Sequence, residues 1–445
     1  MNMRTYDFPG GVHPVNATGG GCHIDGNSIV NMPAPERVVI STLRVSGAQL
    51  TPLVKRGDFV KMGQKIADSD AFVSAPIHAS VSGKVVAVEP RPHPTGRRLV
   101  NAIVIENDHL DAWDAACVPA DPAALTAPEI VRLAREKGLV GLGGATFPTH
   151  VKLNPPRDRK TDTLILNGSE CEPWLSADDR LLQECPDDVI GGVLLAMRAL
   201  GVSRAILGVE ADKPSAIRAI SQAAEGTPVT VRSLRPRYPQ GGEKQLIYAL
   251  TGRKVPAGGL PSDAGCVVFN VGTMAALNQA VSQGRPLIDR VVTVTGNAVS
   301  EPKNLRVRIG TSLRECVRFC GGYLGEAPEK LIAGGPMMGT ALYTDDVPVI
   351  AGTSGIIALS GACAHVPEPS ACLRCGRCHQ VCPMGLQPYA IEEAICARDA
   401  AKAARFYAHQ CIECGACGYI CPARRQLVQN IRLAKALVRG SAAAK

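Results

Sequence analysis

Eight cysteines near the C-terminal end of the chain form two identical runs. The first run consists of Cys372, Cys375, Cys378 and Cys382, and the second, beyond a 27-residue spacer, of Cys411, Cys414, Cys417 and Cys421. A proline follows each run, so both read C-x2-C-x2-C-x3-C-P. Thiolates in this pattern bind 4Fe-4S clusters. The proline stops the loop from continuing as a helix.

The fourth cysteine of each run is expected to cross over to the other cluster. In two-cluster proteins with this pattern, that cysteine ligates the cluster of the opposite run. We therefore predict one cluster on Cys372, Cys375, Cys378 and Cys421, and another on Cys411, Cys414, Cys417 and Cys382. The alternatives are zinc knuckles or structural disulfides. Zinc sites usually contain two C-x2-C pairs, so a double run of four with prolines favours clusters.

A glycine-rich loop further upstream has the composition of a phosphate or flavin site. It reads Gly141-Leu-Gly143-Gly144-Ala145-Thr-Phe147 and is followed by Lys152. Glycines allow backbone N–H groups to converge on a phosphate or a flavin ring. The loop is not a Walker A motif, because no Gly-Lys-Ser/Thr follows, and it comes after a predicted helix instead of a strand. A tight turn between domains is the alternative.

Acidic residues follow the next predicted strand. Asn167 ends the strand Thr163–Asn167, and Glu170 and Glu172 lie just beyond it. Open α/β sheets bind ligands at this end of their strands. A third glycine-acid element, Gly241-Gly242-Glu243-Lys244, lies further along. Taken singly, each element also fits a solvated turn.

The elements around these loops alternate between strands and helices, which indicates a parallel α/β sheet. We predict strands at 163–167, 205–209, 229–234 and 266–270, and helices at 128–138, 186–200, 214–224 and 273–283. The domain that they form is predicted at 126–290.

Three further modules complete the predicted architecture, a multidomain combination of α/β and α+β folds. Residues 1–106 form an N-terminal domain whose β-rich part resembles the barrel-sandwich of lipoyl and biotinyl domains, although Asp68–Ala71 contains no modifiable lysine. Residues 291–340 form a small α+β module, and residues 371–445 form a helical two-cluster domain. Residues 107–125 and 341–370 are expected to be linkers. The cluster spacer Gln387–His409 and the segment Gln426–Val438 are expected to be helical.

The composition fits a folded protein of a reducing compartment. The 445 residues suggest about three domains. Nine of the 17 cysteines lie outside the two runs without a disulfide-like spacing. No secretory signal and no apolar run of membrane-spanning length is found, so we expect no direct membrane span. A net charge of +8 with only 4% aromatic residues makes nucleic-acid binding unexpected.

The motifs together resemble known electron-transfer proteins. The glycine loop, Lys152, Asn167-x-x-Glu-x-Glu-Pro173, the Gly-Glu pair and Asn270 resemble the NADH-oxidising flavoprotein subunit of respiratory complex I. With the N-terminal Phe8–Pro14, the barrel-sandwich and the double ferredoxin-type run, the whole chain resembles the RnfC family of the Rnf ion-translocating electron-transport complexes. The resemblance implies that 126–290 binds FMN and NADH and that 291–340 is a soluble-ligand-binding β-grasp domain.

The resemblance also assigns site residues. Those expected to contact FMN are Gly141, Gly143, Gly144, Lys152, Asn167, Glu170, Gly242, Glu243 and Asn270. Those expected to meet the nicotinamide nucleotide are Ala145, Phe147 and Glu172, of which Glu172 is the expected catalytic residue. The chain departs from the complex I pattern at Leu142, Pro155, Ser169 and Lys244.

The function implied by the resemblance is that of a peripheral subunit through which electrons enter a larger complex. NADH, FMN and two 4Fe-4S clusters would exchange electrons with partner subunits, and indirectly with ferredoxin or a similar acidic redox protein. The implied location is the cytoplasmic side of the cell inner membrane. Two alternatives stay open: a soluble flavin and iron-sulfur reductase of the cobalamin-reductase type, and a non-catalytic iron-sulfur relay.

Overall fold

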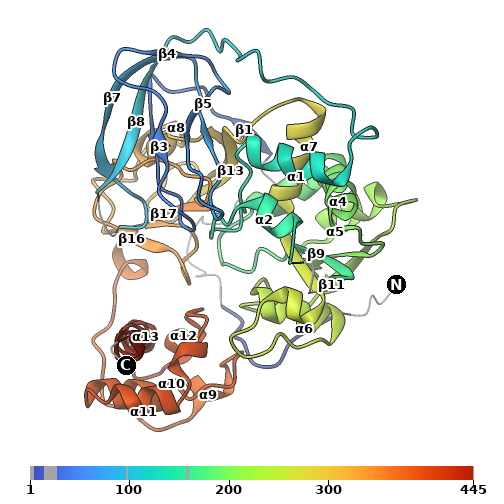
Figure 1. The fold of residues 1–445 in the computed structure, drawn as a ribbon. Coiled ribbons are helices and arrows are strands. Elements are labelled where there is room, and N and C mark those ends of the chain that lie inside the picture. Colours follow the sequence, from blue (N-terminus) through green and yellow to red (C-terminus); the bar gives the residue numbers. More distant parts are fainter. Residues whose placement is uncertain (1–4, 15–27, 97–98, 157–159, 444–445) are drawn as a thin grey trace.

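The computed structural model describes residues 5–14, 28–96, 99–156 and 160–443. Three modules form the upper part of the molecule in Figure 1, and the helical C-terminal domain lies beneath them. Among the described residues, no helix has the length and hydropathy needed to cross a membrane.

The central domain is built on a four-stranded parallel sheet in the order β11-β10-β9-β12. Its strands are β9 (Thr163–Gly168), β10 (Ala205–Glu210), β11 (Val229–Leu234) and β12 (Cys266–Asn270). Its helices are α1 (Ala127–Glu136), α2 (Thr149–Leu153), α3 (Ala177–Glu184), α4 (Pro186–Leu200), α5 (Pro214–Ala223), α6 (Glu243–Thr251) and α7 (Val271–Ser282), with the 3-10 turn η1 (Pro261–Ala264).

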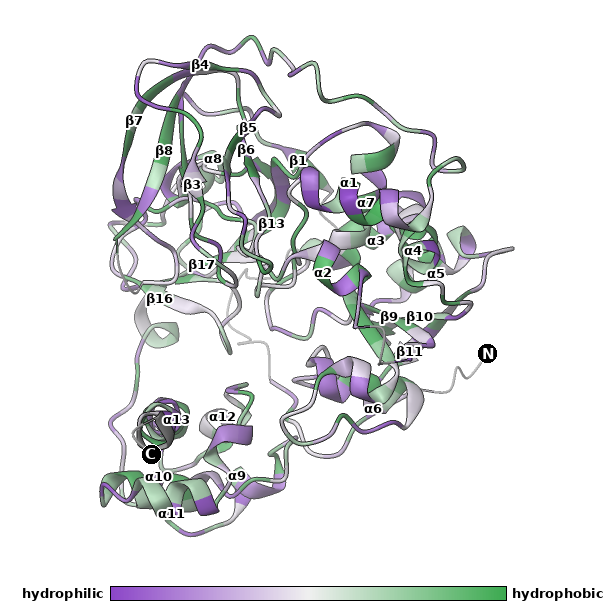
Figure 2. Cartoon of the chain, in the orientation of Figure 1, coloured by the Kyte–Doolittle hydropathy of each residue, from purple (hydrophilic) through white to green (hydrophobic). Residues whose placement is uncertain are grey.

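The strands of this sheet are buried, as their continuous apolar runs predict for a parallel sheet. β10 is buried along its whole length, and β9 is coloured as hydrophobic in Figure 2. The predicted central α/β fold is thus confirmed, with α2, α3 and α6 as helices that the sequence pattern did not reveal.

The barrel-sandwich consists of two small antiparallel sheets, ordered β2-β8-β7-β4 and β3-β5-β6. The strands are β2 (Arg37–Ser41), β3 (Thr51–Pro52), β4 (Phe59–Val60), β5 (Lys65–Asp68), β6 (Ile77–His78), β7 (Gly83–Pro92) and β8 (Leu99–Asn107). A core that includes Val38, Ile66 and Ile103 lies between the two sheets. Arg135 of α1 binds Asp68 Oδ1 at 3.0 Å, so the tip without the lysine packs on the central domain.

The β-grasp module is larger than predicted. Its sheet has the order β1-β14-β13-β17-β15-β16. The elements are β1 (Ile29–Asn31), β13 (Asp289–Thr295), β14 (Lys303–Arg308), α8 (Leu313–Phe319), β15 (Lys330–Ala333), β16 (Thr340–Leu342) and β17 (Gly355–Leu359), followed by η2 (Gly361–Cys363).

Two predicted boundaries therefore differ from the structure. Residues 341–370 are not simply a linker, because β17 lies inside the sheet between β13 and β15. Residues 1–106 are not one barrel-sandwich, because β1 pairs in parallel with β14 of the β-grasp sheet. Both pairings join residues far apart in sequence, which local patterns do not report.

The C-terminal domain is helical. It contains α9 (Arg377–Gln380), α10 (Pro388–Cys396), α11 (Ala400–Arg405), η3 (Ala408–Gln410), α12 (Ala416–Ile420) and α13 (Leu427–Ala443). The spacer between the cysteine runs is helical as predicted, although it breaks into α10 and α11. The N-terminal segment 6–12 runs between this domain and the central domain, where Gly11 N donates to Val381 O at 2.8 Å.

Candidate cofactor sites

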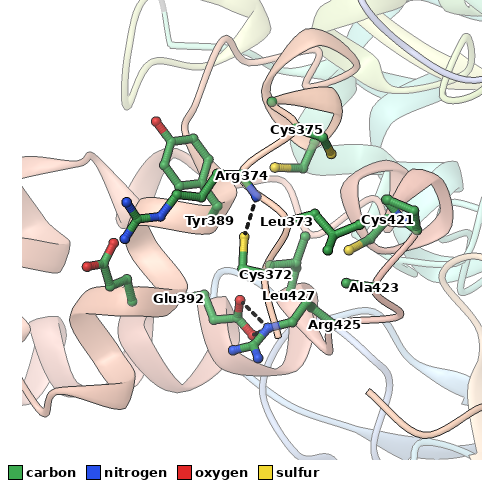
Figure 3. A pocket seen from close by; sticks show the side chains of 14 residues that line it. Cys372, Leu373, Arg374, Cys375, Tyr389, Glu392, Cys421, Ala423, Arg425 and Leu427 are labelled. Atoms are coloured by element: carbon green, nitrogen blue, oxygen red, sulfur yellow. Dashed lines mark hydrogen bonds and ion pairs between the residues drawn. The ribbon is translucent and has the colours of Figure 1, made fainter. Parts of the chain in front are cut away.

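The first cysteine site is an open cavity of about 460 Å³ in the C-terminal domain. Cys372, Cys375, Cys378 and Cys421 line it, as predicted. Figure 3 shows the sulfurs of Cys372, Cys375 and Cys421 around this space. All lining residues belong to the segment 372–427, and Cys372 and Cys375 are exposed.

The second cysteine site gathers Cys382 with Cys411, Cys414 and Cys417. The predicted crossover is therefore present in the geometry: Cys382 lies with the second run and Cys421 with the first. This cavity is smaller, about 20 Å³, and apolar side chains such as Met384, Leu386 and Ile431 close around it. Cys414 and Cys417 are buried.

Local backbone geometry turns both runs inward. Gly376 and Gly415 adopt φ angles of 75° and 86°, at the starts of α9 and α12. These left-handed positions favour glycine and bring the third cysteine back toward the first two. Backbone N–H groups donate to Cys372 Sγ, Cys411 Sγ and Cys382 Sγ at 3.4, 3.3 and 3.3 Å.

The donor set fits a cluster better than a single ion. Hydrogen bonds to sulfur are among the features that set cluster potentials. The cysteines of the first site surround a cavity of about 460 Å³, as a cube of iron and sulfide requires, whereas zinc draws its ligands to about 2.3 Å from one point.

The predicted flavin residues meet where the strand order of the central sheet reverses. From β9 the chain continues outward to β10 and β11, and then returns to the other side of β9 as β12. Asn167 and Asn270 are paired in register at the ends of β9 and β12. Such a reversal is where open α/β sheets bind their ligands.

The glycine loop lies against this point. A Cβ on Gly143 would come 3.5 Å from Cβ of Asn270. Gly144 has a φ of 102°, and a Cβ there would meet no atom within 4 Å. Gly141 N donates to Phe147 O at 2.9 Å, which closes the loop, while Gly143 and Ala145 are exposed. The loop therefore presents backbone to open space, as a flavin or phosphate site requires.

The third glycine-acid element contacts the end of β9. Asn167 Nδ2 donates to Gly241 O at 2.9 Å, and Gly242 precedes the first helical residue of α6, Glu243. Lys152 of α2 binds Glu243 Oε1 at 2.9 Å and Val268 O at 3.0 Å. The structure thus brings Lys152, Glu243 and Asn167 into one neighbourhood.

Glu170 lies close to this group, and both oxygens of its carboxyl group accept hydrogen bonds from the protein backbone. Its two oxygens accept from the backbone N–H groups of Asp178 and Asp179, both at 2.9 Å, at the start of α3. Asp178 in turn accepts from Asn270 Nδ2 at 2.6 Å. Burial, and then the nearby Asp178 charge, raise the pKa of Glu170 to about 8. Glu170 therefore holds α3 and, through Asp178, orients Asn270.

Glu172 points to a different part of the molecule. Its oxygens accept from the backbone N–H groups of Met337 and Met338 at 2.9 Å each, in the loop after β15. This loop also approaches the second cysteine run, because a Cβ on Gly415 would come 3.0 Å from Met337 O. Glu172 thus joins the central domain to the β-grasp loop beside the second cysteine site.

Several polar residues near the sites were not found from the sequence. Gln240 is fully buried, and neither of its side-chain polar atoms has a partner among the described residues; the same holds for Ser169 Oγ. Buried polar groups without partners are rare in folded proteins and favour an absent ligand nearby. Arg290 of β13 donates to Leu142 O at 3.2 Å and so supports the glycine loop. No sequence motif marks Gln240 or Arg290.

The buried carboxyl groups predict how stability depends on pH. Burial raises the pKa of Glu172 and Glu210 to about 7 each, above the unfolded value of 4.5. The folded state therefore binds more protons between these values, and stability falls as pH rises from about 4.5 to about 7. In Glu172→Gln, the free energy of unfolding should decrease with pH by up to about 3 kcal/mol less than in wild type. Thermal midpoints measured across the pH range would show this. Glu368→Gln, at an exposed position, is the control; an unchanged slope in Glu172→Gln would contradict the prediction.

Four family models match the chain in separate segments. Residues 6–110 match the RnfC barrel sandwich hybrid domain, residues 134–279 the Nuo51 FMN-binding domain, residues 291–341 the SLBB domain and residues 365–422 the 4Fe-4S dicluster domain.

Curated relatives match most of the chain. The chain is 49% identical over 382 residues, 86% of its length and 82% of the relative's, to the C component of the proton-translocating ferredoxin:NAD(+) oxidoreductase complex of Clostridium ljungdahlii. It is 46% identical to the C component of the Na(+)-translocating ferredoxin:NAD(+) oxidoreductase complex of Acetobacterium woodii, with 98% of both chains covered. It is 41% identical to the C component of the ion-translocating oxidoreductase complex of Rhodobacter capsulatus, over 97% of this chain and 83% of that one.

Proposed function

Because this chain belongs to the RnfC family, the C components of ion-translocating ferredoxin:NAD(+) oxidoreductase complexes, we propose that it is the subunit that links NAD(H) to the one-electron carriers of such a complex. It is an oxidoreductase subunit that uses FMN, two 4Fe-4S clusters and partner subunits. The observation that carries the proposal is the pair of crossed cysteine sites beside a flavin-type α/β domain.

The central domain supplies the binding groups for FMN. When bound, FMN exchanges two electrons with NAD(H) and single electrons with clusters. The glycine loop offers backbone N–H groups, and Asn167 and Asn270 offer side-chain amides at the strand reversal. The Lys152 ammonium has three donors, of which two reach Glu243 and Val268. Its third donor and its charge would be available to the flavin or its phosphate.

The nucleotide residues are a separate part of the proposal. Ala145 and Phe147 lie in the glycine loop, beside the proposed flavin position, and are assigned to the nicotinamide nucleotide. Glu172 is assigned a supporting role, because its carboxylate holds the loop at Met337 and Met338. It orders the wall between the flavin site and the second cysteine site.

The two cysteine sites have different positions relative to the central domain. The second site contacts that domain: Gln245 Nε2 of α6 lies 3.5 Å from Pro383 O, and Gly258 N donates to Gln410 Oε1 at 3.2 Å. The first site is lined only by the C-terminal domain and is open. Electrons from the flavin side therefore reach the second site before the first.

The first cysteine site lies in a positively charged domain, which would suit an acidic redox partner. Residues 371–445 contain eleven lysines and arginines and four acidic residues, a net charge of +7 out of +8 for the whole chain. Arg374 and Arg377 lie beside the first site. Arg374 is exposed, and so is its neighbour Leu373, at 65%. Positive charge around an exposed redox centre steers acidic partners to it.

An anaerobic visible spectrum tests the function directly. We expect the purified chain to hold one FMN, about eight irons and about eight sulfides, and to bleach in the flavin and cluster bands when NADH is added. A protein with clusters but no flavin would instead be the non-catalytic relay. The soluble reductase alternative is disfavoured because residues 6–110 match the RnfC barrel-sandwich model, which lies before the glycine loop.

The chain is a subunit of a membrane-associated complex, and we propose that partner subunits hold it at the cytoplasmic side of the inner membrane. Expressed with its partners, it should sediment with membranes and be released by high salt or a chaotrope without detergent, because the contact is between proteins. Binding of the isolated chain to protein-free liposomes in high salt would contradict this.

A further inference from the structure

Tyr238 lies at the junction of the central and C-terminal domains. It lies between β11 and α6, three residues before Gly241, and only 1% of it is exposed. Its phenol donates to the backbone carbonyl of Cys414 at 2.5 Å, across 176 residues of sequence. Cys414 is one of the four cysteines of the second site.

The N-terminal segment fixes the backbone of Tyr238. Tyr238 N donates to Val12 O, and Val12 N donates to Tyr238 O, both at 2.8 Å. The preceding residue, Gly11, donates to Val381 O of the C-terminal domain. A Cβ on Gly10 would come 3.1 Å from the carbonyl oxygen of Cys382, another cysteine of the second site. The segment therefore touches both Tyr238 and the second site.

Tyr238 also connects to the proposed flavin site. Gly241 N donates to Cys171 Sγ at 3.3 Å, and Cys171 packs in the same apolar cluster as Tyr238 and Cys414. A continuous chain of contacts between buried and partly buried residues thus runs from the glycine-acid element at Gly241 to the second cysteine site. No comparable contact joins the described part of the central domain to the first site, whose lining is confined to the segment 372–427.

We propose that Tyr238 is a positioning residue: its hydroxyl holds the Cys414 loop, and with it the second cluster, against the flavin site. This inference rests on the proposed function for the identity of the cofactors. If the hydrogen bond only satisfied the buried hydroxyl of Tyr238, its loss would lower the stability of the fold. It would not change the reduction potential of one cluster in particular. The positioning role predicts an effect confined to the cluster on Cys382, Cys411, Cys414 and Cys417.

Tyr238→Phe in the full-length protein with its cofactors tests this. Iron, sulfide and FMN contents should stay at wild-type values. After titration with dithionite, electron paramagnetic resonance should show a two- to tenfold shift in the reduction equilibrium of one cluster toward the oxidised form. This is the range expected for one buried hydrogen bond, and about 18–59 mV for a one-electron couple. The other cluster should be unchanged. Tyr248→Phe, on α6 of the same domain, is the matched control.

The outcomes are separable from failure of the proposed function. Because dithionite reduces the clusters directly, the potentials do not depend on NADH or FMN. Wild-type potentials for both clusters, or equal shifts in both, would overturn the positioning role. Loss of FMN with unchanged clusters would also overturn it. A wild-type protein without eight irons would instead refute the proposed function.

A second variant keeps the proposal testable if Tyr238→Phe does not fold. Gly11 has a φ of 80°, and a Cβ there would come 2.7 Å from Tyr238 O. Gly11→Ala should therefore displace Tyr238 and shift the same cluster as Tyr238→Phe. Gly57→Ala is its control, because Gly57 also has a positive φ but a Cβ there would meet no atom within 4 Å. A shift in the first cluster alone would contradict the proposal.

Discussion

Replacing Cys382 with serine is expected to remove the cluster of the second run, although Cys382 belongs to the first run in sequence. The iron content should fall from about eight to about four per chain. The physical reason is the crossover in the fold, where Cys382 lines the cavity of Cys411, Cys414 and Cys417. Iron and sulfide assays with electron paramagnetic resonance would show which cluster survives.

Two further variants complete this test. Cys421→Ser should remove the other cluster, because Cys421 lines the cavity of Cys372, Cys375 and Cys378. Cys396→Ser, an exposed cysteine outside both runs, should leave all eight irons in place. If Cys382→Ser instead removed the signal that Cys375→Ser removes, each run would bind its own cluster and the crossover would be wrong.

Lys152→Ala is expected to release FMN while both clusters stay bound. The ammonium group donates to Glu243 and to the Val268 carbonyl, at 2.9 and 3.0 Å, beside the residues proposed to bind FMN. Loss of a hydrogen bond to a charged group costs about 1.5–3 kcal/mol, or roughly ten- to 150-fold in dissociation constant. Fluorescence of the FMN released on dilution would measure this affinity.

The matched control for Lys152 is another lysine of the same domain. Lys244 lies next to Glu243 in α6, but its Nζ donates to Pro256 O on the surface, at 3.2 Å. Lys244→Ala should therefore keep wild-type FMN affinity. Equal FMN content in wild type and Lys152→Ala, with wild-type NADH kinetics in both, would place the flavin elsewhere in the chain.

Local sequence determined the parts of this protein whose chemistry depends on short spacing. The spacing of the cysteines, the glycines and the prolines is enough to predict two 4Fe-4S sites. The left-handed φ angles at Gly376 and Gly415 fit the glycines of the same pattern. Alternating apolar segments were enough to predict the parallel sheet. The resemblance to the complex I flavoprotein subunit assigned Asn167 and Asn270 to one site, and the structure pairs them in register at the ends of β9 and β12.

Only the tertiary structure decided which distant segments meet. The pairing of β1 with β14 and the place of β17 within the sheet join residues more than 50 positions apart, so no local period marks them. The partners of Glu172 are backbone N–H groups at Met337 and Met338, and every residue type except proline carries such a group. The Tyr238 hydroxyl likewise finds a backbone carbonyl, at Cys414. A sequence names the side chains that can do chemistry, but contacts to backbone across domains depend on packing, and that packing sets which cysteine site lies against the central domain.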